Sequence, residues 1–398
     1  MDHKDITFIR TVKEIEAIRQ IWERLQLQEP YPAINADIDR YLSVLQAAEN
    51  ECTPLILLLK QNDQPRAMVI GRLERHSISL RLGYKTILRP KLRCMTVAYG
   101  GIIGQPDEGI SAMLVRRLMG LLRDREVDLI FFNHLRTDSV FFRQVRRIPG
   151  LLCRNHFPVI EPHWRISIPK TMDQFFASRS KSTRHNLRNR LNRLERKYPG
   201  QARIHSYSKP EDVAQAIKDA AYISKKTYQY GLGVGFVDTQ QTHILLNAAA
   251  AKGWLRCHVL YVNEEPVAFD YNLKYGRAYF GELTGYDPKW KDFNVGTVTM
   301  LKVLEILCQE GTTDYFDFGF GDAEYKKMYT DECWHEVAET YIFALRFYPL
   351  LINLLNSINS ALASALTWTM QKIKLFAWIK RLWRRSLQNG SKELVESG

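Results

Sequence analysis

The two halves of this 398-residue chain repeat one order of elements, and this repeat constrains the fold more than any other feature. In the first half, two apolar strands turn at Pro65, and a glycine-containing loop then leads through an amphipathic helix to VDLIFFNHL. In the second half, two strands turn at Pro266, and PKWKDFNVG leads through a helix to DYFDFGFG. The matching order predicts an internally duplicated α/β fold, although unduplicated α/β proteins also alternate strands and helices.

Chain length and two prolines predict the domain boundaries. The hydrophobic fraction of 45% and aromatic fraction of 11% indicate a globular protein, and the length suits two domains. The connection NHFPVIEPHW contains two prolines and is the expected boundary. We therefore predict a first domain at 1–163, a second at 164–346 and a tail at 347–398.

The amino-terminal segment and the cysteines predict a cytoplasmic protein. The first 20 residues carry charges every few positions and lack the apolar core of a signal peptide. The six cysteines are scattered without a CxxC pair, which favours free thiols in a reducing compartment. The histidines lack ligand spacing, so we expect no metal site.

The loop before the second-half helix has the features of an anion-binding helix start. Asn294 is expected to cap the helix, and Gly296 lets backbone amides approach a ligand closely. Unpaired N–H groups at a helix start attract phosphate, and Lys289 adds positive charge nearby. The equivalent first-half loop contains Asp107 and Glu108, which would repel a pyrophosphate. We therefore expect a cofactor only in the second half, although an ordinary helix cap would have the same Asn-x-Gly sequence.

Four polar residues near this helix are candidates for acid–base chemistry. Tyr325 can donate a proton to a leaving thiolate, and Lys326 can hold an acceptor or stabilise developing negative charge. Glu282 and Asp270 are candidates for the base that takes a proton from an attacking amine or hydroxyl. Packing or solvation would explain the same residues without catalysis, and water relays could replace both carboxylates.

Three segments of the second half resemble the GNAT-type domain of the CelD-like acetyltransferase family of cellulose biosynthesis, which is related to the Fem-type aminoacyl transferases. The segments are GWLRCHVLYVNEEPVAFDYNL, GYDPKWKDFNVGTVTML and FDFGFGDAEYKKMY. The resemblance is strongest from Trp164 to Phe343, and the first half is similar to the family's weaker amino-terminal half. It implies an α/β (α+β) fold of two GNAT-like domains in tandem, followed by an amphipathic helical tail.

The resemblance also implies that acyl-CoA enters where two central strands separate and that an acceptor attacks the thioester directly. A backbone amide near Leu283 or Thr284 would polarise the thioester carbonyl, and Tyr325 would be the acid. The implied pyrophosphate contacts are Asn294, Val295, Gly296 and Thr297. Asn294-Val295-Gly296 replaces the Ser-Pro-Gly sequence that is common in the family.

Two basic segments hold most of the net charge of +13. The first, 179–197, contains eight Lys/Arg and one Glu on a predicted helix whose leucines form a packing stripe. On its polar face, Arg184 and Arg188 are candidates for binding an anionic acceptor, and Gly319 and Gly321 permit close backbone approach to that acceptor. A solvated helix, lipid headgroups or a tRNA are the alternatives, and the lack of interleaved aromatics argues against other nucleic acids.

The second basic segment is the tail, which contains seven Lys/Arg and two Glu from Phe347 onwards. Residues 350–370 carry no charge, and polar side chains recur there and just beyond at helical spacing: Asn353, Asn356, Ser360, Ser364, Thr367 and Gln371. With Trp368, Trp378 and Trp383, this pattern predicts a helix that lies on the anionic inner face of the cytoplasmic membrane. A transmembrane anchor or a helix packed on a partner would be of similar length.

The leading functional hypothesis is transfer of an acetyl or longer acyl group from CoA to an amine or hydroxyl. The acceptor would be a small molecule or a glycan or lipid-linked intermediate of envelope polysaccharide synthesis. One alternative is a Fem-like transferase in which the arginine helix contacts aminoacyl-tRNA. Another is a non-catalytic GNAT-like scaffold of a polysaccharide assembly complex.

Overall fold

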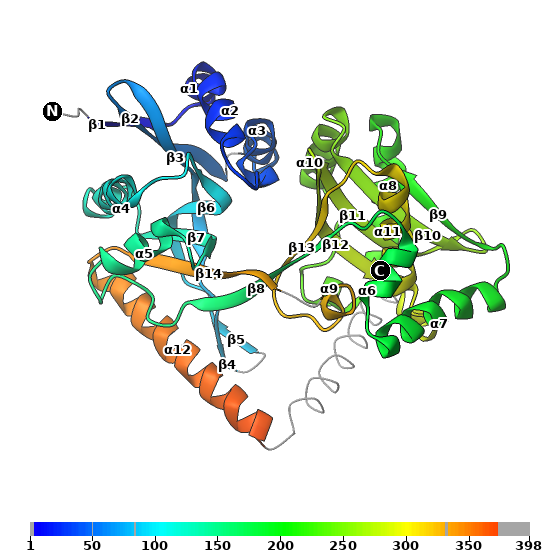
Figure 1. Ribbon diagram of the computed structural model, residues 1–398. Coiled ribbons are helices and arrows are strands. Elements are labelled where there is room, and N and C mark those ends of the chain that lie inside the picture. Colours follow the sequence, from blue (N-terminus) through cyan, green and yellow to red (C-terminus); the bar gives the residue numbers. More distant parts are fainter. Residues whose placement is uncertain (1–3, 50, 83–84, 331–332, 373–398) are drawn as a thin grey trace. The chain divides into compact units, whose positions relative to one another are not determined.

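The computed structural model describes residues 4–49, 51–82, 85–330 and 333–372, which form two compact units (Figure 1). Unit 1 contains the chain up to Pro162 together with the stretch that begins at His335, and unit 2 contains His163–Trp334. The chain thus leaves unit 1, forms unit 2 and returns. Residues 335–346, which the sequence placed in the second domain, therefore belong to unit 1, and so does the described start of the tail.

Unit 1 contains a mixed six-stranded sheet in the order β1-β2-β3-β6-β7-β14. Its pairs are antiparallel except β6 with β7, which is parallel. The strands are β1 (Lys4–Ile9), β2 (Cys52–Gln61), β3 (Gln64–Ser77), β6 (Lys91–Ile103), β7 (Leu129–Arg136) and β14 (Cys333–Phe343), with a separate hairpin of β4 (Leu80–Leu82) and β5 (Lys85–Leu88).

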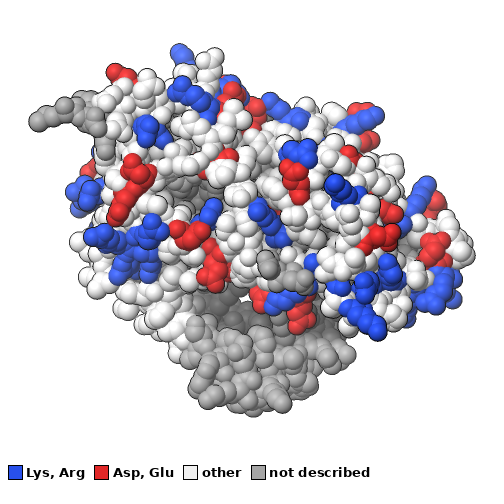
Figure 2. Space-filling view, viewed as in Figure 1, with Lys and Arg blue, Asp and Glu red and all other residues white. Residues whose placement is uncertain are grey.

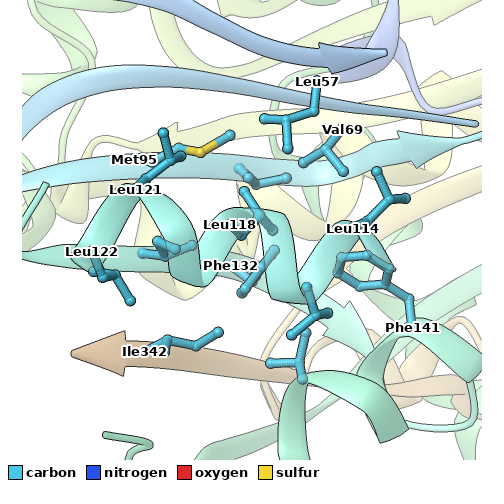
Figure 3. Close-up of a cluster of buried hydrophobic side chains, with 14 of the residues drawn as sticks. Leu57, Val69, Met95, Leu114, Leu118, Leu121, Leu122, Phe132, Phe141 and Ile342 are labelled. Atoms are coloured by element: carbon cyan, nitrogen blue, oxygen red, sulfur yellow. The ribbon is translucent and has the colours of Figure 1, made fainter. Parts of the chain in front are cut away.

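Helices cover both faces of this sheet because successive strand residues point to opposite sides. Leu55, Leu57 and Leu59 pack in one cluster with α4, and Figure 3 shows Leu57 beside this helix, whereas Ile56 and Leu58 pack against α1 to α3. The helices of unit 1 are α1 (Val12–Ala17), α2 (Arg19–Leu27), η1 (Ile34–Ala36), α3 (Ile38–Ala47), α4 (Glu108–Arg123), α5 (Val140–Arg147) and α12 (Phe347–Lys372).

Unit 2 contains a second six-stranded sheet in the order β9-β10-β11-β12-β13-β8. Only the pair of β12 with β13 is parallel. The strands are β8 (Val159–Ser167), β9 (Ala202–Tyr207), β10 (Leu255–Val262), β11 (Glu265–Tyr275), β12 (Ala278–Tyr286) and β13 (Tyr315–Phe320).

The long helix α11 lies between this sheet and α7. Its Val298 packs with Leu260 of β10, and its Leu301 packs with Leu187 of α7. Burial of Leu187 and Leu194 confirms the predicted packing stripe of α7. The helices of unit 2 are α6 (Met172–Ser178), α7 (Lys181–Lys197), η2 (Pro210–Asp212), α8 (Val213–Ser224), α9 (Tyr228–Gly231), α10 (Gln240–Ala251), η3 (Pro288–Phe293), α11 (Val295–Glu310) and η4 (Lys326–Met328).

The two units repeat one topology, which confirms the predicted mixed α/β fold of two similar halves. Each has antiparallel strands, then a helical crossover to a parallel strand, and each hairpin turns on two residues of positive φ, Asn62–Asp63 and Asn263–Glu264. The sixth strand comes from the chain segments that connect the units: β8 for unit 2 and the returning β14 for unit 1.

Candidate functional site

The strands β12 and β13 pair over only a short stretch. Ala278–Phe280 pairs with Tyr315–Asp317, and beyond Phe280 the described pairs of β12 are made with β11 alone. Glu282 is an extra residue in β12, because Leu283 is opposite Tyr271 and Gly281 is opposite Asn272. The exposed stretch of Glu282, Leu283 and Thr284 is therefore accessible to a ligand at the point where the strands separate.

The start of α11 has no side-chain cap. Asn294 stands at the N-cap position, but its backbone is left-handed, with φ of 52° and ψ of 40°, and its side chain makes no capping hydrogen bond. Our prediction of a capping asparagine is therefore wrong in its chemistry, because only the position is as expected. Asparagine tolerates the left-handed conformation better than most residues. The first N–H groups of α11 consequently have no side-chain acceptor from Asn294.

The corresponding helix of unit 1 is capped by a carboxylate. Asp107 accepts a hydrogen bond of 2.8 Å from the backbone N–H of Ile110 at the start of α4. This negative side chain occupies the place where an anion would bind to the helix dipole. The two halves thus differ at the one position where a phosphate would bind.

Beside the start of α11 lies a hollow of about 220 Å³ whose walls are polar and basic. It is lined by Asn186, Asn189, Arg190, Arg193 and Asn294. In addition, the Nη1 atom of Arg190 donates a hydrogen bond of 2.8 Å to Oγ1 of Thr297. Figure 2 shows Lys and Arg side chains gathered over the part of unit 2 where α7 lies. Two arginines of α7 and the residue that precedes the first turn of α11 therefore line one small volume, a combination that suits a phosphate.

The arginines that the sequence proposed as acceptor contacts lie elsewhere on α7. By helical spacing, Arg184 and Arg188 are on the side opposite Arg190. Arg188 lies 3.7 Å from Asp173 and over the ring of Phe176. The lining residues of α7, which recur at i, i+3, i+4 and i+7, were missed from the sequence, and this polar stripe is the sequence signal that could have identified them.

Three other predicted cofactor contacts are placed by the structure. Lys289 is exposed, and its ammonium lies 3.6 Å from Glu265. Val295 is buried in the core beneath α11. At Gly296, a Cβ atom would lie 3.3 Å from Cδ1 of Tyr286, so glycine permits the close approach of this ring to the helix.

Asp270 of β11 is a buried carboxylate that lies opposite Thr284 in the sheet. It is 6% exposed, and its Oδ2 has no hydrogen-bond partner among the described residues. Burial raises the pKa of Asp270 from 3.8 to about 6, although a hydrogen bond from Asn272 acts in the opposite direction. A carboxylate with these properties can accept a proton near neutral pH.

Tyr325 lies close enough to Asp270 for the two groups to interact electrostatically. Desolvation first, and then the charges of Asp270 and Tyr228, raise the pKa of Tyr325 to about 12. The phenol therefore remains protonated at neutral pH and can act as an acid, although the residue as a whole is 42% exposed. The sequence predicted Tyr325 and Asp270 but missed Tyr228, which lies on the short helix α9 and fits no sequence pattern.

Lys326 holds the loop that follows β13. Its buried ammonium donates hydrogen bonds to the carbonyl oxygens of Gly319, Phe320 and Gly321 at 3.2, 2.6 and 3.3 Å. Gly319 and Gly321 have φ values of 69° and 89°, which favour glycine. These contacts give Lys326 a positioning role, because its ammonium is bound to backbone.

Comparison with known proteins identifies the domain type. Residues 181–327 match the family model described as an acetyltransferase (GNAT) domain. No curated protein matches the chain. The match covers the helix α7, the strand β12, the start of α11 and the loop that contains Tyr325.

Several solved structures have a similar fold at low sequence identity. FemX has a TM-score of 0.56 at 10% identity, covering 85% of this chain and 98% of that chain. A tandem GNAT protein from the clavulanic acid biosynthesis pathway has 0.51 at 9%, covering 86% and 100%. The C-terminal domain (DUF2156) of a putative lysylphosphatidylglycerol synthetase from Agrobacterium fabrum has 0.51 at 9%, covering 86% and 96%. The chain therefore has the fold of tandem GNAT proteins, as the sequence predicted.

Proposed function

We propose that unit 2 transfers an acyl group from acyl-CoA to an amine or hydroxyl. The observation that supports this most is the uncapped start of α11 beside Arg190 and Arg193, close to the separation of β12 and β13. The helix N–H groups and Arg190 would bind the pyrophosphate, while the thioester would lie along the open edge of β12. The capped helix α4 makes a second CoA site in unit 1 unfavourable.

The side chains of this site supply a base and an acid for direct transfer. Asp270 takes the proton of the acceptor as its nitrogen or oxygen attacks the thioester carbonyl, and an N–H of Leu283 or Thr284 polarises that carbonyl. The carbon–sulfur bond then breaks while the new carbon–nitrogen or carbon–oxygen bond remains. Tyr325 donates its proton to the leaving sulfur, which makes free CoA, and solvent returns the proton from Asp270 to the phenol.

We propose the acceptor by its chemical class. The resemblance to CelD-like proteins suggests a glycan or lipid-linked molecule of envelope polysaccharide synthesis. The basic far face of α7, with Arg184 and Arg188, favours aminoacyl-tRNA as the second candidate donor, because exposed arginines bind phosphate. A scaffold without catalysis would bind neither donor productively.

Calorimetry of the full chain separates these candidates. We expect CoA to bind with a dissociation constant below about 1 mM and tRNA to bind only through salt-sensitive contacts. Thiol release from acetyl-CoA in the presence of an acceptor extract then distinguishes an enzyme from a scaffold. Absence of CoA binding at about 1 mM would contradict the proposal.

Replacement of Tyr325 with phenylalanine tests the acid. The variant Tyr325→Phe should lower kcat by about 100-fold, because the sulfur then leaves without a proton donor. CoA affinity by calorimetry should stay unchanged, since the ring is preserved. Tyr222→Phe, at an exposed tyrosine of α8, is the matched control, and an unaltered rate for Tyr325→Phe would remove its assigned role.

Replacement of Arg190 tests the phosphate site. The variant Arg190→Ala should weaken CoA binding about tenfold, because one charged hydrogen bond to phosphate is lost. Arg188→Ala is the matched control on the other side of α7 and should bind CoA like the original protein. Equal losses in both variants would point to a diffuse effect of charge and not to a site at α11.

A further inference from the structure

Two polar side chains of the helix α12, Asn353 and Ser357, are buried against other parts of unit 1. The Nδ2 atom of Asn353 donates hydrogen bonds of 2.9 and 3.0 Å to the carbonyl oxygens of Leu152 and Arg154. Oγ of Ser357 lies 2.9 Å from Nδ1 of His156. Beside them, Ile352 is buried in a cluster beneath the sheet. Of the predicted polar stripe, Asn353 is thus buried and bonded inside the protein, together with Ser357, which the prediction did not include.

The opposite side of α12 is apolar and uncovered in the described chain. Leu354 is 56% exposed and Ile358 is 48% exposed, far more than an apolar residue in a packed helix. The exposed large apolar residues at the start and along the helix are Leu345, Phe347, Tyr348, Leu351, Leu354, Ile358 and Leu362. From Leu351 they recur at steps of three and four residues, so they form one continuous row.

The segment that bonds to the polar side of α12 also exposes apolar side chains. Residues 151–160 contain five exposed large apolar residues: Leu151, Leu152, Phe157, Val159 and Ile160. The hydrogen bonds from Asn353 and Ser357 hold this segment against α12. We call the exposed row of α12 and these five residues the α12 surface. Large exposed apolar surfaces mark sites of interaction with another molecule or a membrane.

The positive charge of the sequence that follows this surface favours an anionic partner. All seven Lys/Arg that follow Phe347 lie at or after residue 372, together with two Glu. From Lys374 onwards these basic residues are interspersed with apolar ones, including Trp378 and Trp383, in a stretch outside the described residues. A second copy would bring two such basic tails together, whereas anionic lipid would neutralise them. Among the described residues, no helix combines the length and apolarity needed to cross a bilayer.

We propose that the α12 surface lies in the boundary between headgroups and acyl chains of an anionic bilayer. Unit 1 covers the polar side of α12, and the lipid covers its apolar side, so each side of the helix has a partner of its own polarity. The basic composition of the sequence from Lys372 onwards suits anionic headgroups. This inference is independent of the acyl transfer in unit 2.

Flotation of the full chain with vesicles tests this surface. We expect binding to vesicles with about 30% phosphatidylglycerol and weaker binding to pure phosphatidylcholine, because the basic residues lose their partner there. The double variant Leu354→Ser, Ile358→Ser should lower partitioning at least about tenfold, because two side chains no longer enter the apolar layer. Both residues are exposed, so the fold should be unchanged by circular dichroism.

The matched control changes two exposed apolar residues of unit 1 that lie outside the α12 surface. Val12→Ser, Leu27→Ser should bind vesicles like the original protein. Equal binding by the Leu354/Ile358 variant, or no binding by the original chain to either vesicle, would overturn the proposal. It would also be overturned if light scattering shows a dimer that the Leu354/Ile358 variant converts to monomer without a change in vesicle binding, because the surface would then bind a second copy.

Discussion

Asp270→Asn is expected to lower kcat/KM for acyl transfer by about 100- to 10,000-fold, because asparagine cannot accept the acceptor's proton. The substitution keeps the shape of the side chain, and Asp270 is not among the residues that line the hollow at the helix start. The affinity for CoA should therefore stay unchanged. In the original protein, kcat/KM should fall as the pH drops below about 6, where Asp270 becomes protonated.

The same substitution should raise stability at neutral pH. Burial raises the folded-state pKa of Asp270 above 3.8, so its contribution to stability is fully present below that pH and is lost as the pH rises through about 6. At pH 8 the buried charge of Asp270 lowers the free energy of unfolding by up to about 3 kcal/mol, since burial raises the pKa by about two units. Denaturant unfolding should show Asp270→Asn more stable than the original protein at pH 8 and equal to it near pH 4.

Asp314→Asn supplies the control for both measurements. Asp314 is an exposed carboxylate paired with Arg277, so its removal should change neither the rate nor the pH profile. A rate loss in Asp270→Asn without the gain in stability would indicate a disrupted fold and not a missing base. An unchanged rate would transfer the role of base to another group, with Glu282 at the bulge of β12 as the next candidate.

Local chemistry made part of this site predictable from sequence. The glycine-containing loop before α11 and the tyrosine after β13 can be identified because their roles depend on residues close in the chain. The alternating apolar pattern around Asp270 placed it in a strand, but not at a position where one carboxylate oxygen lacks a partner. Such a property depends on every element that packs around the residue.

The parts that the sequence missed depend on contacts between distant segments. Arg190 contacts Thr297, which is 107 residues away in the chain, only because α7 packs on α11 with one orientation about its own axis. The leucine stripe of α7 fixes which side is buried, but not which polar flank faces the helix start. The strand β14 likewise returns to unit 1 and pairs with β7, which lies some 200 residues earlier in the chain. No local sequence pattern predicts this pairing.

The difference between the two helix starts gives the second large expected effect. Asn294→Asp should weaken CoA binding by about 10- to 100-fold, because a carboxylate at the edge of the hollow would repel phosphate and compete for the helix N–H groups. Aspartate, like asparagine, tolerates the left-handed backbone at this position, so the fold should persist. Calorimetry with CoA and a thermal unfolding curve measure the two quantities separately.

Asp107→Asn in unit 1 is the matched control for this change, because it makes the opposite charge change at the equivalent helix. It should lower the free energy of unfolding by about 1 kcal/mol or less, because the cap on α4 becomes weaker. The affinity and stoichiometry of CoA binding should stay unchanged. If Asn294→Asp binds CoA normally, the start of α11 is not the phosphate site. If Asp107→Asn weakens binding as much as Asn294→Asp does, unit 1 contributes to the CoA site, and the assignment of one site to the uncapped helix of unit 2 is wrong.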